Sequence, residues 1–328
     1  NTPVGGLMAG VAGGVWRMND LLDFVGNSQW PLAPQDIENS CRFNSGSSDN
    51  LSRTPSGAGN RKTFTLSWWV KRSKLGSRQS IFNNTDGSGQ DGVYFDFLAD
   101  DTLLLGDYGT GSWGSPKFET TQVFRDTSAW YHIVYAVDTT QSTQSDRVKI
   151  YVNGSQVTAF DTSDYPSQDA DTLWNRSDAI YIGTYTAGGN YFGGYLTEIV
   201  NIDGQQLLPT SFGEFDSTTG IWKPKKIGQQ FAAGGGAGTN GFYLDFKDSS
   251  NLGNDLSGNN NDFTVNNLTS IDQTTDTCVE NYVALNPLAT TTTQGTVSQG
   301  NLEFDRSGSS DGWVSILSTI AASSGKYY

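Results

Sequence analysis

Three runs of alternating apolar and polar residues constrain the fold of this chain more than any other feature. The run 63–71 places four large apolar side chains on one face and mostly small or polar ones on the other, with Trp69 as the exception. The runs 130–138 and 147–157 repeat the same period of two, which is typical of half-buried β-strands. The last run contains Asn153-Gly154, a dipeptide typical of two-residue hairpin turns. These features together predict one antiparallel β-sandwich.

The remainder of the chain has the composition of short strands joined by many turns. It has 328 residues with 39 glycines, and only 16% are charged, against about 25% in ordinary globular proteins. Further strands are expected over 39–44, 79–82, 93–98 and 102–105, with turn signals roughly every 8 to 12 residues, as in all-β sandwiches. A chain of this length can bury a substantial core.

The segments "FTLSWWVK", "WYHIVYAVD", "VKIYVNGSQV" and "IYIGTYTAGGNYFGGYLTEIVNIDGQQL" resemble the laminin-G-like, concanavalin-A-like jelly roll. The phrases "RFNSGSSDNLSRTP", "DLSGNNNDFTVNN" and "NYVALNPL" are similar to tail-fibre-like virion proteins of marine bacteriophages that carry this module. The resemblance covers about residues 38 to 328. It implies an all-β sandwich with an N-terminal arm and a C-terminal β extension, located on the exterior of a virion. Lectins, glycan hydrolases and inert structural modules all use this fold, so the resemblance alone does not select one function.

Changes in composition divide the chain into five segments. Residues 1–37 are apolar but glycine-rich, and we expect an arm that attaches to other virion proteins, with a strand or coil laid over the sandwich as the alternative. Residues 38–235 should form the jelly roll, and 236–267 a hairpin that completes it or else begins a second sandwich. Residues 268–299 are expected to be a Thr-rich linker, and 300–328 the start of a further β module. We also expect a homo-oligomer.

The charge balance argues against two classes of partner. The net charge is −14, and the basic residues cluster only at 223–226. Binding to nucleic acid phosphates or to an anionic membrane surface needs concentrated Lys and Arg, so neither is expected. No stretch of about 20 apolar residues occurs, so we expect no membrane insertion.

Cysteine and metal chemistry give weak signals. Cys41 and Cys278 lie far apart and form no disulfide framework or zinc spacing, so we expect two free buried thiols, with a bridge as the alternative. The stretches 161–171 and 255–262 offer Asp and Asn oxygens of the kind that calcium accepts. Such residues also stabilise turns without a metal. We therefore predict no cofactor and no metal, with calcium as the open alternative.

Catalytic patterns are similarly weak. A retaining glycan hydrolase needs two carboxylates about 5 Å apart, and the nearest local pairs are Glu198 with Asp203 and Glu214 with Asp216. The resemblance implies a structural role for Glu198, and neither pair has the alternating acidic pattern of laminarinase-type enzymes. His132, the only histidine, lies inside an alternating strand and is expected to be a hydrogen-bonded or outward-facing strand residue. We predict no enzymatic activity, with a glycan hydrolase as the second alternative.

Aromatic residues among glycines occur in the loops 106–114 and 185–192, and the loop 161–176 combines four aspartates with two aromatics. Loops on a rigid sheet are common binding sites. We therefore predict a tail-fibre or tail-associated virion protein whose sandwich binds host surface glycans where the first two loops meet. The alternative is a capsid or collar decoration protein in which the same aromatics pack against neighbouring copies. The candidate glycan-binding residues are Tyr108, Trp113, Trp174, Tyr185, Asn190 and Tyr191.

Overall fold

The structure is a computed structural model that describes residues 37–88, 91–225, 227, 236–290, 295–306 and 315–319. The chain divides after Asp36 into two compact units, and every described residue belongs to the second. The predicted arm at 1–37 therefore lies outside the described residues, apart from its last position. Within the described part, no helix is long and apolar enough to cross a membrane.

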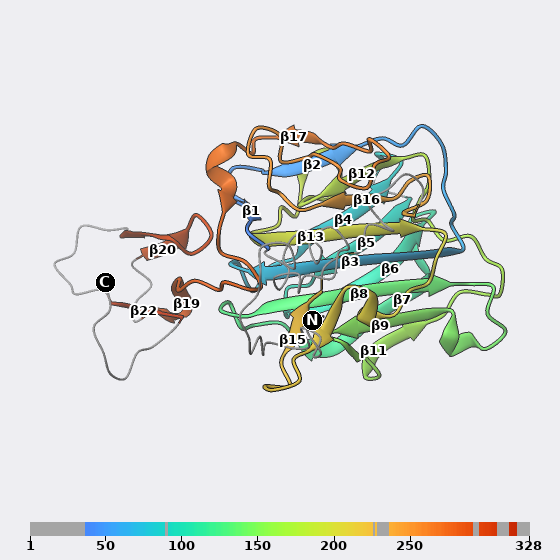
Figure 1. The fold of residues 1–328 in the computed structure, drawn as a ribbon, viewed down its shortest axis with the longest axis horizontal. Helices are drawn as coiled ribbons and strands as arrows, with labels where there is room; N and C mark the ends of the chain where they lie inside the picture. The colour runs from blue at the N-terminus through green and yellow to red at the C-terminus, as the bar shows by residue number, and fades with distance from the viewer. Residues whose placement is uncertain are drawn as a thin grey trace, which may run out of the picture. The chain divides into compact units, whose positions relative to one another are not determined.

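The described residues form two large antiparallel sheets, here called sheet A and sheet B, which confirms the all-β, laminin-G-like sandwich (Figure 1). Sheet A contains, in spatial order, β10 (Ser155–Gln156), β9 (Val148–Val152), β8 (Trp130–Asp138), β3 (Thr63–Arg72), β13 (Gly194–Asp203), β1 (Ser40–Phe43) and β18 (Gln273–Thr274), with β16 (Phe242–Leu244) also paired to β13. Sheet B contains β11 (Phe160–Asp164), β7 (Ser112–Val123), β6 (Thr102–Gly109), β5 (Gly92–Phe97), β4 (Gln79–Thr85), β12 (Ala179–Ile182), β2 (Asn50–Arg53) and β17 (Thr264–Asn266).

Smaller elements complete the described chain. Three two-stranded sheets pair β14 (Gly213–Phe215) with β15 (Trp222–Pro224), β19 (Leu285–Thr290) with β22 (Ile316–Ser318), and β20 (Gly295–Ser298) with β21 (Glu303–Arg306). The 3-10 turns are η1 (Gln144–Asp146), η2 (Thr186–Gly188), η3 (Pro209–Ser211) and η4 (Ser270–Asp272).

The main core lies between the two sheets, where the alternation in the sequence places it. The four apolar residues of β3 are fully buried there: Phe64, Leu66, Trp68 and Val70. Trp68 stacks on Phe95 of sheet B, with ring centroids 6.2 Å apart and an interplanar angle of 9°. Burying a large apolar side chain stabilises a fold by about 1.5–3 kcal/mol, so this row is a main reason why the two sheets stay together.

The predicted turn at Asn153-Gly154 joins β9 to β10 as a two-residue hairpin. Both residues have positive φ, 47° and 78°, as this type of turn requires. Glycine is needed at the second position for another reason as well: a Cβ there would lie 2.3 Å from the ring of Trp222.

The outer face of sheet A is covered, which explains the exceptional Trp69. Its ring lies on this face in a buried cluster with Trp130, Tyr195 and Trp222. A second apolar cluster on the same sheet includes Phe212 together with residues of β8 and β13.

Residues 236–267 do not form the predicted hairpin. Their strands pair with different sheets, β16 with β13 in sheet A and β17 with β2 in sheet B. The connection between them is fixed by Asp255, whose carboxylate accepts hydrogen bonds from the backbone N–H groups of Tyr243, Ser257 and Asn261. The segment therefore adds one strand to each of the two sheets, whereas a hairpin would add both strands to the same sheet.

The described residues of the Thr-rich stretch, 268–290 and 295–299, contain strands and a 3-10 turn that a linker would lack. Its strand β18 pairs with β1 at the edge of sheet A, and η4 before it has a capping box between Thr269 and Asp272. Beyond this point the described strands make only two-stranded sheets. That residues 300–328 begin a further β module remains a prediction.

Candidate functional site

Three of the predicted glycan-binding residues meet on the outer face of sheet B. Tyr108, Trp113 and Tyr185 are half-buried and surround Tyr94, which is 3% exposed. Tyr94 stacks on Tyr185 at 5.4 Å between ring centroids and makes edge contacts with Trp113 at 5.8 Å and Tyr108 at 5.9 Å. Tyr108 and Trp113 also contact each other at 5.2 Å. We call these four residues the aromatic cluster.

Strand register explains why these rings converge. In β5 the core-facing residues are Val93, Phe95 and Phe97, so Tyr94 and Asp96 point to the opposite face. Tyr108 and Trp113 are cross-strand partners in β6 and β7. The alternation in 93–98 therefore indicates that Tyr94 points away from the core, but a rule that considers only loops does not select it.

Two basic side chains border the aromatic cluster. The Arg78 guanidinium lies 5.8 Å from the ring centroid of Tyr94 and 5.9 Å from that of Trp113, while the Lys117 ammonium lies 5.5 Å from Trp113. Arg78 is held by Asp96, whose carboxylate accepts its Nε–H at 2.6 Å. Burial raises the pKa of Asp96 despite this pairing.

Hydroxyl groups of the aromatic cluster have different environments. The Tyr108 hydroxyl donates to the Gly111 carbonyl at 2.7 Å, which ties the ring to its own turn. Burial, followed by the neighbouring Tyr185 hydroxyl, raises the pKa of Tyr94, so its hydroxyl is neutral at ordinary pH. The surface thus presents half-exposed ring faces and edges with cations at the margin.

Trp174 was wrongly predicted to be a binding platform. It is fully buried and packs against Phe82 and Phe95 of the main core. Its indole N–H donates to the Asn201 side chain at 3.0 Å, which satisfies the polar atom of the ring. A large aromatic in a polar loop can thus be an anchor for the loop rather than an exposed surface.

Asn190 and Tyr191 belong to the same loop as Tyr185 but are not part of the aromatic cluster. The Asn190 carbonyl accepts the Ser80 N–H at 2.7 Å, and Tyr191 forms a parallel bridge to Ser80. Within the described residues Tyr191 makes no ring contact with the four clustered aromatics. These two residues therefore hold the 185–192 loop against β4.

The carboxylate pairs considered for hydrolysis are engaged in structural contacts. Both oxygens of Glu198 accept the Tyr243 hydroxyl, at 3.1 and 2.9 Å. Asp203 accepts the backbone N–H groups of Asn60 and Asn240 at 2.6 and 2.9 Å. Glu198 also has φ of 50° at the irregularity of β13, which fits a structural role.

The second pair belongs to a surface hairpin. Lys223 lies between Glu214 and Asp216, at 3.5 and 3.2 Å from their oxygens. Asp216 also accepts the N–H groups of Thr218 and Thr219, and hydrogen bonds from these backbone groups lower its pKa. A lowered pKa is the opposite of what a general acid needs.

His132 is a buried, hydrogen-bonded strand residue, as predicted. The Trp222 indole N–H donates to its Nδ1 at 3.0 Å, and its Nε2 lies 2.9 Å from the Ser67 hydroxyl. Since an indole nitrogen can only donate, Nδ1 must be the acceptor and the proton resides on Nε2. Burial lowers the pKa of His132 to about 3, so the ring is neutral at ordinary pH.

The two stretches considered for calcium differ in the contacts of their carboxylates. Both Asp255 oxygens accept N–H or O–H groups within their own turn. In the 161–171 stretch, Asp171 is 3.7 Å from Arg61. Searching the described ranges finds no group of three or more acidic, His or Cys side chains that could hold a metal. Cys41 and Cys278 are free thiols.

Comparison with known proteins gives the class of the sandwich. Residues 45–203 match the laminin G model of the concanavalin A-like lectin/glucanases superfamily, a region just under half of the chain. The protein therefore contains a laminin-G-like, concanavalin-A-like domain. No curated protein matches the chain.

Several solved structures are similar to the chain at low identity and low TM-score. A putative carbohydrate binding protein from Bacteroides ovatus is 15% identical, with a TM-score of 0.44 over 70% of this chain and 58% of that one. A SAP-like pentraxin from Limulus polyphemus is 17% identical, with a TM-score of 0.39 over 53% and 80%. Domains LG4-5 of the mouse laminin alpha1 chain are 16% identical, with a TM-score of 0.37 over 52% and 43%. The chain spans less than two thirds of the Bacteroides and mouse chains.

Proposed function

We propose that the sandwich is a non-catalytic, lectin-like module that binds a glycan at the aromatic cluster. The observation that carries this proposal is the convergence of three half-exposed rings over the buried Tyr94 on a rigid sheet. Aromatic rings offer large apolar faces at low entropic cost, and these suit the C–H faces of a sugar. Arg78 and Lys117 at the margin can donate hydrogen bonds to sugar hydroxyls.

Binding without hydrolysis is the better proposal for a domain that matches the model of the concanavalin A-like lectin/glucanases superfamily. A hydrolase needs one carboxyl able to donate a proton and a second able to attack or to activate water. Glu198 and Asp203 are bound by internal donors, and Glu214 and Asp216 share Lys223. All four carboxylates therefore have structural partners.

The wider proposal is that this chain is a tail-fibre-like virion protein on the exterior of the particle. It rests on the resemblance of "RFNSGSSDNLSRTP" and "NYVALNPL" to such proteins, with residues 1–37 as the attachment to other virion proteins. One stacking site contributes little affinity, so adhesion to a host surface would depend on several copies of the chain acting together.

A purely structural decoration protein is the second candidate, and one observation favours it. Half of the exposed large apolar side chains lie in the C-terminal part of the described chain: Val279, Tyr282, Val283, Leu288, Leu302 and Leu317. Apolar surface of this kind suits packing against neighbouring copies.

The glycan proposal is tested with the full chain on an array of bacterial surface polysaccharides. Trp113→Ala and Tyr185→Ala should each weaken binding roughly fivefold, since one stacked ring contributes on the order of 1 kcal/mol. The unfolding midpoint should fall only slightly, because both rings are half-buried at the surface of the sheet. Tyr282→Ala is the matched control, because Tyr282 is 48% exposed and lies outside the aromatic cluster. Equal binding by all four proteins would favour the structural candidate, and unfolding of both variants would make these rings part of the core.

A further inference from the structure

A cavity of about 640 Å³ lies at one end of the sandwich. Its walls are the turns after β1 and β3, Asp101, Arg125 and Gly193 on one side, and residues 287–288 and 295–301 on the other. The volume falls in the range of small-molecule pockets, roughly 300–1,000 Å³. None of its lining residues belongs to the aromatic cluster, so this rim cavity is a separate feature.

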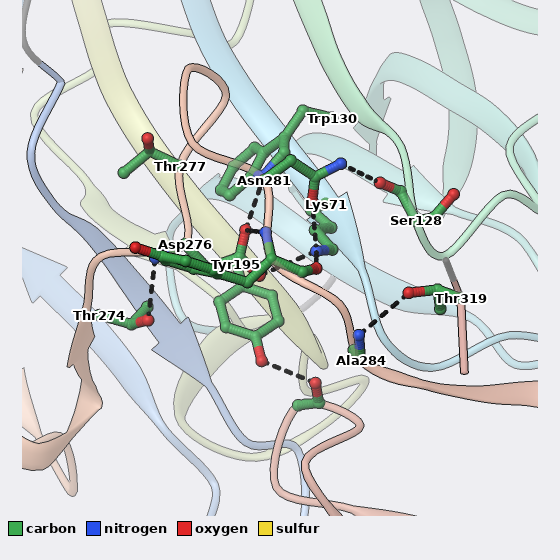
Figure 2. Close-up of polar contacts among 12 residues, drawn as sticks. Lys71, Ser128, Trp130, Tyr195, Thr274, Asp276, Thr277, Asn281, Ala284 and Thr319 are labelled. Carbon is green, nitrogen blue, oxygen red and sulfur yellow. Dashed lines mark hydrogen bonds and ion pairs between the residues drawn. The ribbon is translucent and has the colours of Figure 1, made fainter. Parts of the chain in front are cut away.

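The C-terminal wall of the rim cavity is fastened to sheet A by buried contacts (Figure 2). The Lys71 ammonium is paired with Asp276 at 2.8 Å and donates to the Asn281 side chain at 2.7 Å. The Tyr195 hydroxyl donates to the carbonyl of Gly300, a lining residue, at 2.7 Å. Lys71 and Tyr195 are each 1% exposed, so these buried contacts hold Asp276, Asn281 and the lining residue Gly300 against sheet A.

Polar side chains converge on the floor of the rim cavity around Gly193. A Cβ at this glycine would lie 3.1 Å from Lys74 Cβ and 3.5 Å from the hydroxyls of Ser45 and Ser73. The Lys74 ammonium has only a long contact to the Ser45 hydroxyl, at 3.5 Å. It makes no ion pair with any described residue, so its charge is available to a ligand.

The acidic residue of the rim cavity is already neutralised. Asp101 accepts the Gly76 N–H and lies 3.0 Å from both the Arg72 and Arg125 guanidiniums. Burial alone would raise the pKa of Asp101, but these three donors lower it overall. Arg125 is 55% exposed at its side chain, and its Nη1 has no partner among the described residues. The lining is therefore positive, in a chain whose net charge is −14.

We propose that the rim cavity binds an anionic group with two or more acceptor oxygens: a carboxylate, sulfate or phosphate, either free or carried on a small ligand. Arg125 supplies its Nη1–H groups, because its Nε and Nη2 already donate to Asp101 and to the Asp100 carbonyl, and Lys74 supplies a mobile point charge. The serine hydroxyls of the floor, Ser45 and Ser73, offer further donors to the same group.

Isothermal titration of the full chain at low ionic strength tests the proposal, with sulfate, inorganic phosphate and glucuronate as probes and glucose as the neutral comparison. Lys74→Met should raise the Kd of the anions about tenfold, the effect of one lost charge-assisted hydrogen bond. Lys74→Arg should restore most of the affinity. Lys62→Met is the control, because Lys62 also lacks an ion pair in the described chain but lies outside the cavity.

Two outcomes support the proposal and identify the ligand. Tighter binding of glucuronate than of sulfate would indicate an acidic sugar, and the reverse order a free inorganic anion. The proposal is overturned if no anion saturates the wild-type chain, if Lys74→Met and Lys62→Met behave alike, or if glucose binds as well as glucuronate.

Discussion

Two buried groups have opposite pKa shifts. Their contributions to the free energy of unfolding should therefore change by nearly equal and opposite amounts between about pH 5 and 7. The first is His132, neutral between Ser67 and Trp222, with its pKa lowered to about 3 by burial. The second is Asp107, whose pKa burial raises to about 7, against the Leu173 N–H and the charge of Arg61, which lower it.

The two shifts have opposite signs in the stability. The unfolded chain protonates its histidine near pH 6.5, whereas the folded chain does not until about pH 3. The contribution of His132 is therefore complete above pH 6.5 and is lost as the pH falls. The folded chain keeps the Asp107 proton up to about pH 7, whereas the unfolded chain loses it near pH 4. The contribution of Asp107 is therefore largest in acid and is lost as the pH rises.

The two pKa shifts determine how much the free energy of unfolding changes with pH. Between pH 7 and pH 5 the folded state loses about 2 kcal/mol through His132 and gains about 2 kcal/mol through Asp107. Asp107→Asn keeps the shape of the side chain and removes its titration, so this variant should become about 2 kcal/mol less stable over that interval relative to wild type. His132→Gln should show a relative gain of the same size.

Urea unfolding at pH 7 and pH 5 measures the effect, with wild type, both single variants and the double variant compared at the same ionic strength. All other titrating groups are common to the four proteins and drop out of the differences. The double variant should again follow wild type. Parallel pH profiles for wild type and Asp107→Asn would refute the reasoning, because the carboxyl would then titrate alike in both states.

Three further predictions concern a buried ion pair, Glu198 and the N-terminal residues. Lys71→Met should lower the free energy of unfolding by about 3 kcal/mol, because it leaves the buried Asp276 without its cation. Urea titration measures this loss. Adding Asp276→Leu to the variant should recover most of the lost free energy. The wild-type chain should release no reducing ends from bacterial surface polysaccharide, and Glu198→Gln should behave identically; release that only the variant lacks would make Glu198 catalytic. Deleting residues 1–30 should leave a soluble β protein by circular dichroism that no longer joins the particle, whereas normal incorporation would exclude the arm as the attachment.

The sandwich could be predicted from the sequence because its signal is local. Alternation in 63–71 determines which side of β3 faces the core, and Asn153-Gly154 determines one turn. The pairing of 236–267 could not be obtained in this way. Two short strands separated by a polar loop suggest a hairpin, yet their partners, β13 and β2, lie far away in sequence. Long-range pairing depends on the shape of the assembled sheets, which local patterns do not contain.

The candidate site was predictable in part for a similar reason. Glycine-rich loops with aromatics pointed to Tyr108, Trp113 and Tyr185, but the same rule selected Trp174, which is buried. Residue type does not distinguish an aromatic ring that lies at the surface from one that packs in the core. The buried centre of the cluster, Tyr94, followed a different rule, since it occupies the outward position of a strand.

A glycan site is expected on sheet B rather than on sheet A, because other parts of the chain cover the outer face of sheet A. Its outer face also carries a row of aromatics, but Trp69 is buried with Trp130, Tyr195 and Trp222. Trp222 arrives on a hairpin that follows the jelly-roll strands, and Asp276, further along the chain, accepts the indole N–H of Trp130 at 3.2 Å. A ligand on that face would have to displace these packed side chains and leave Lys71 and Asp276 unpaired. The segments after β13 therefore close one face of the sandwich, and the half-exposed rings that remain for a glycan are those on the other.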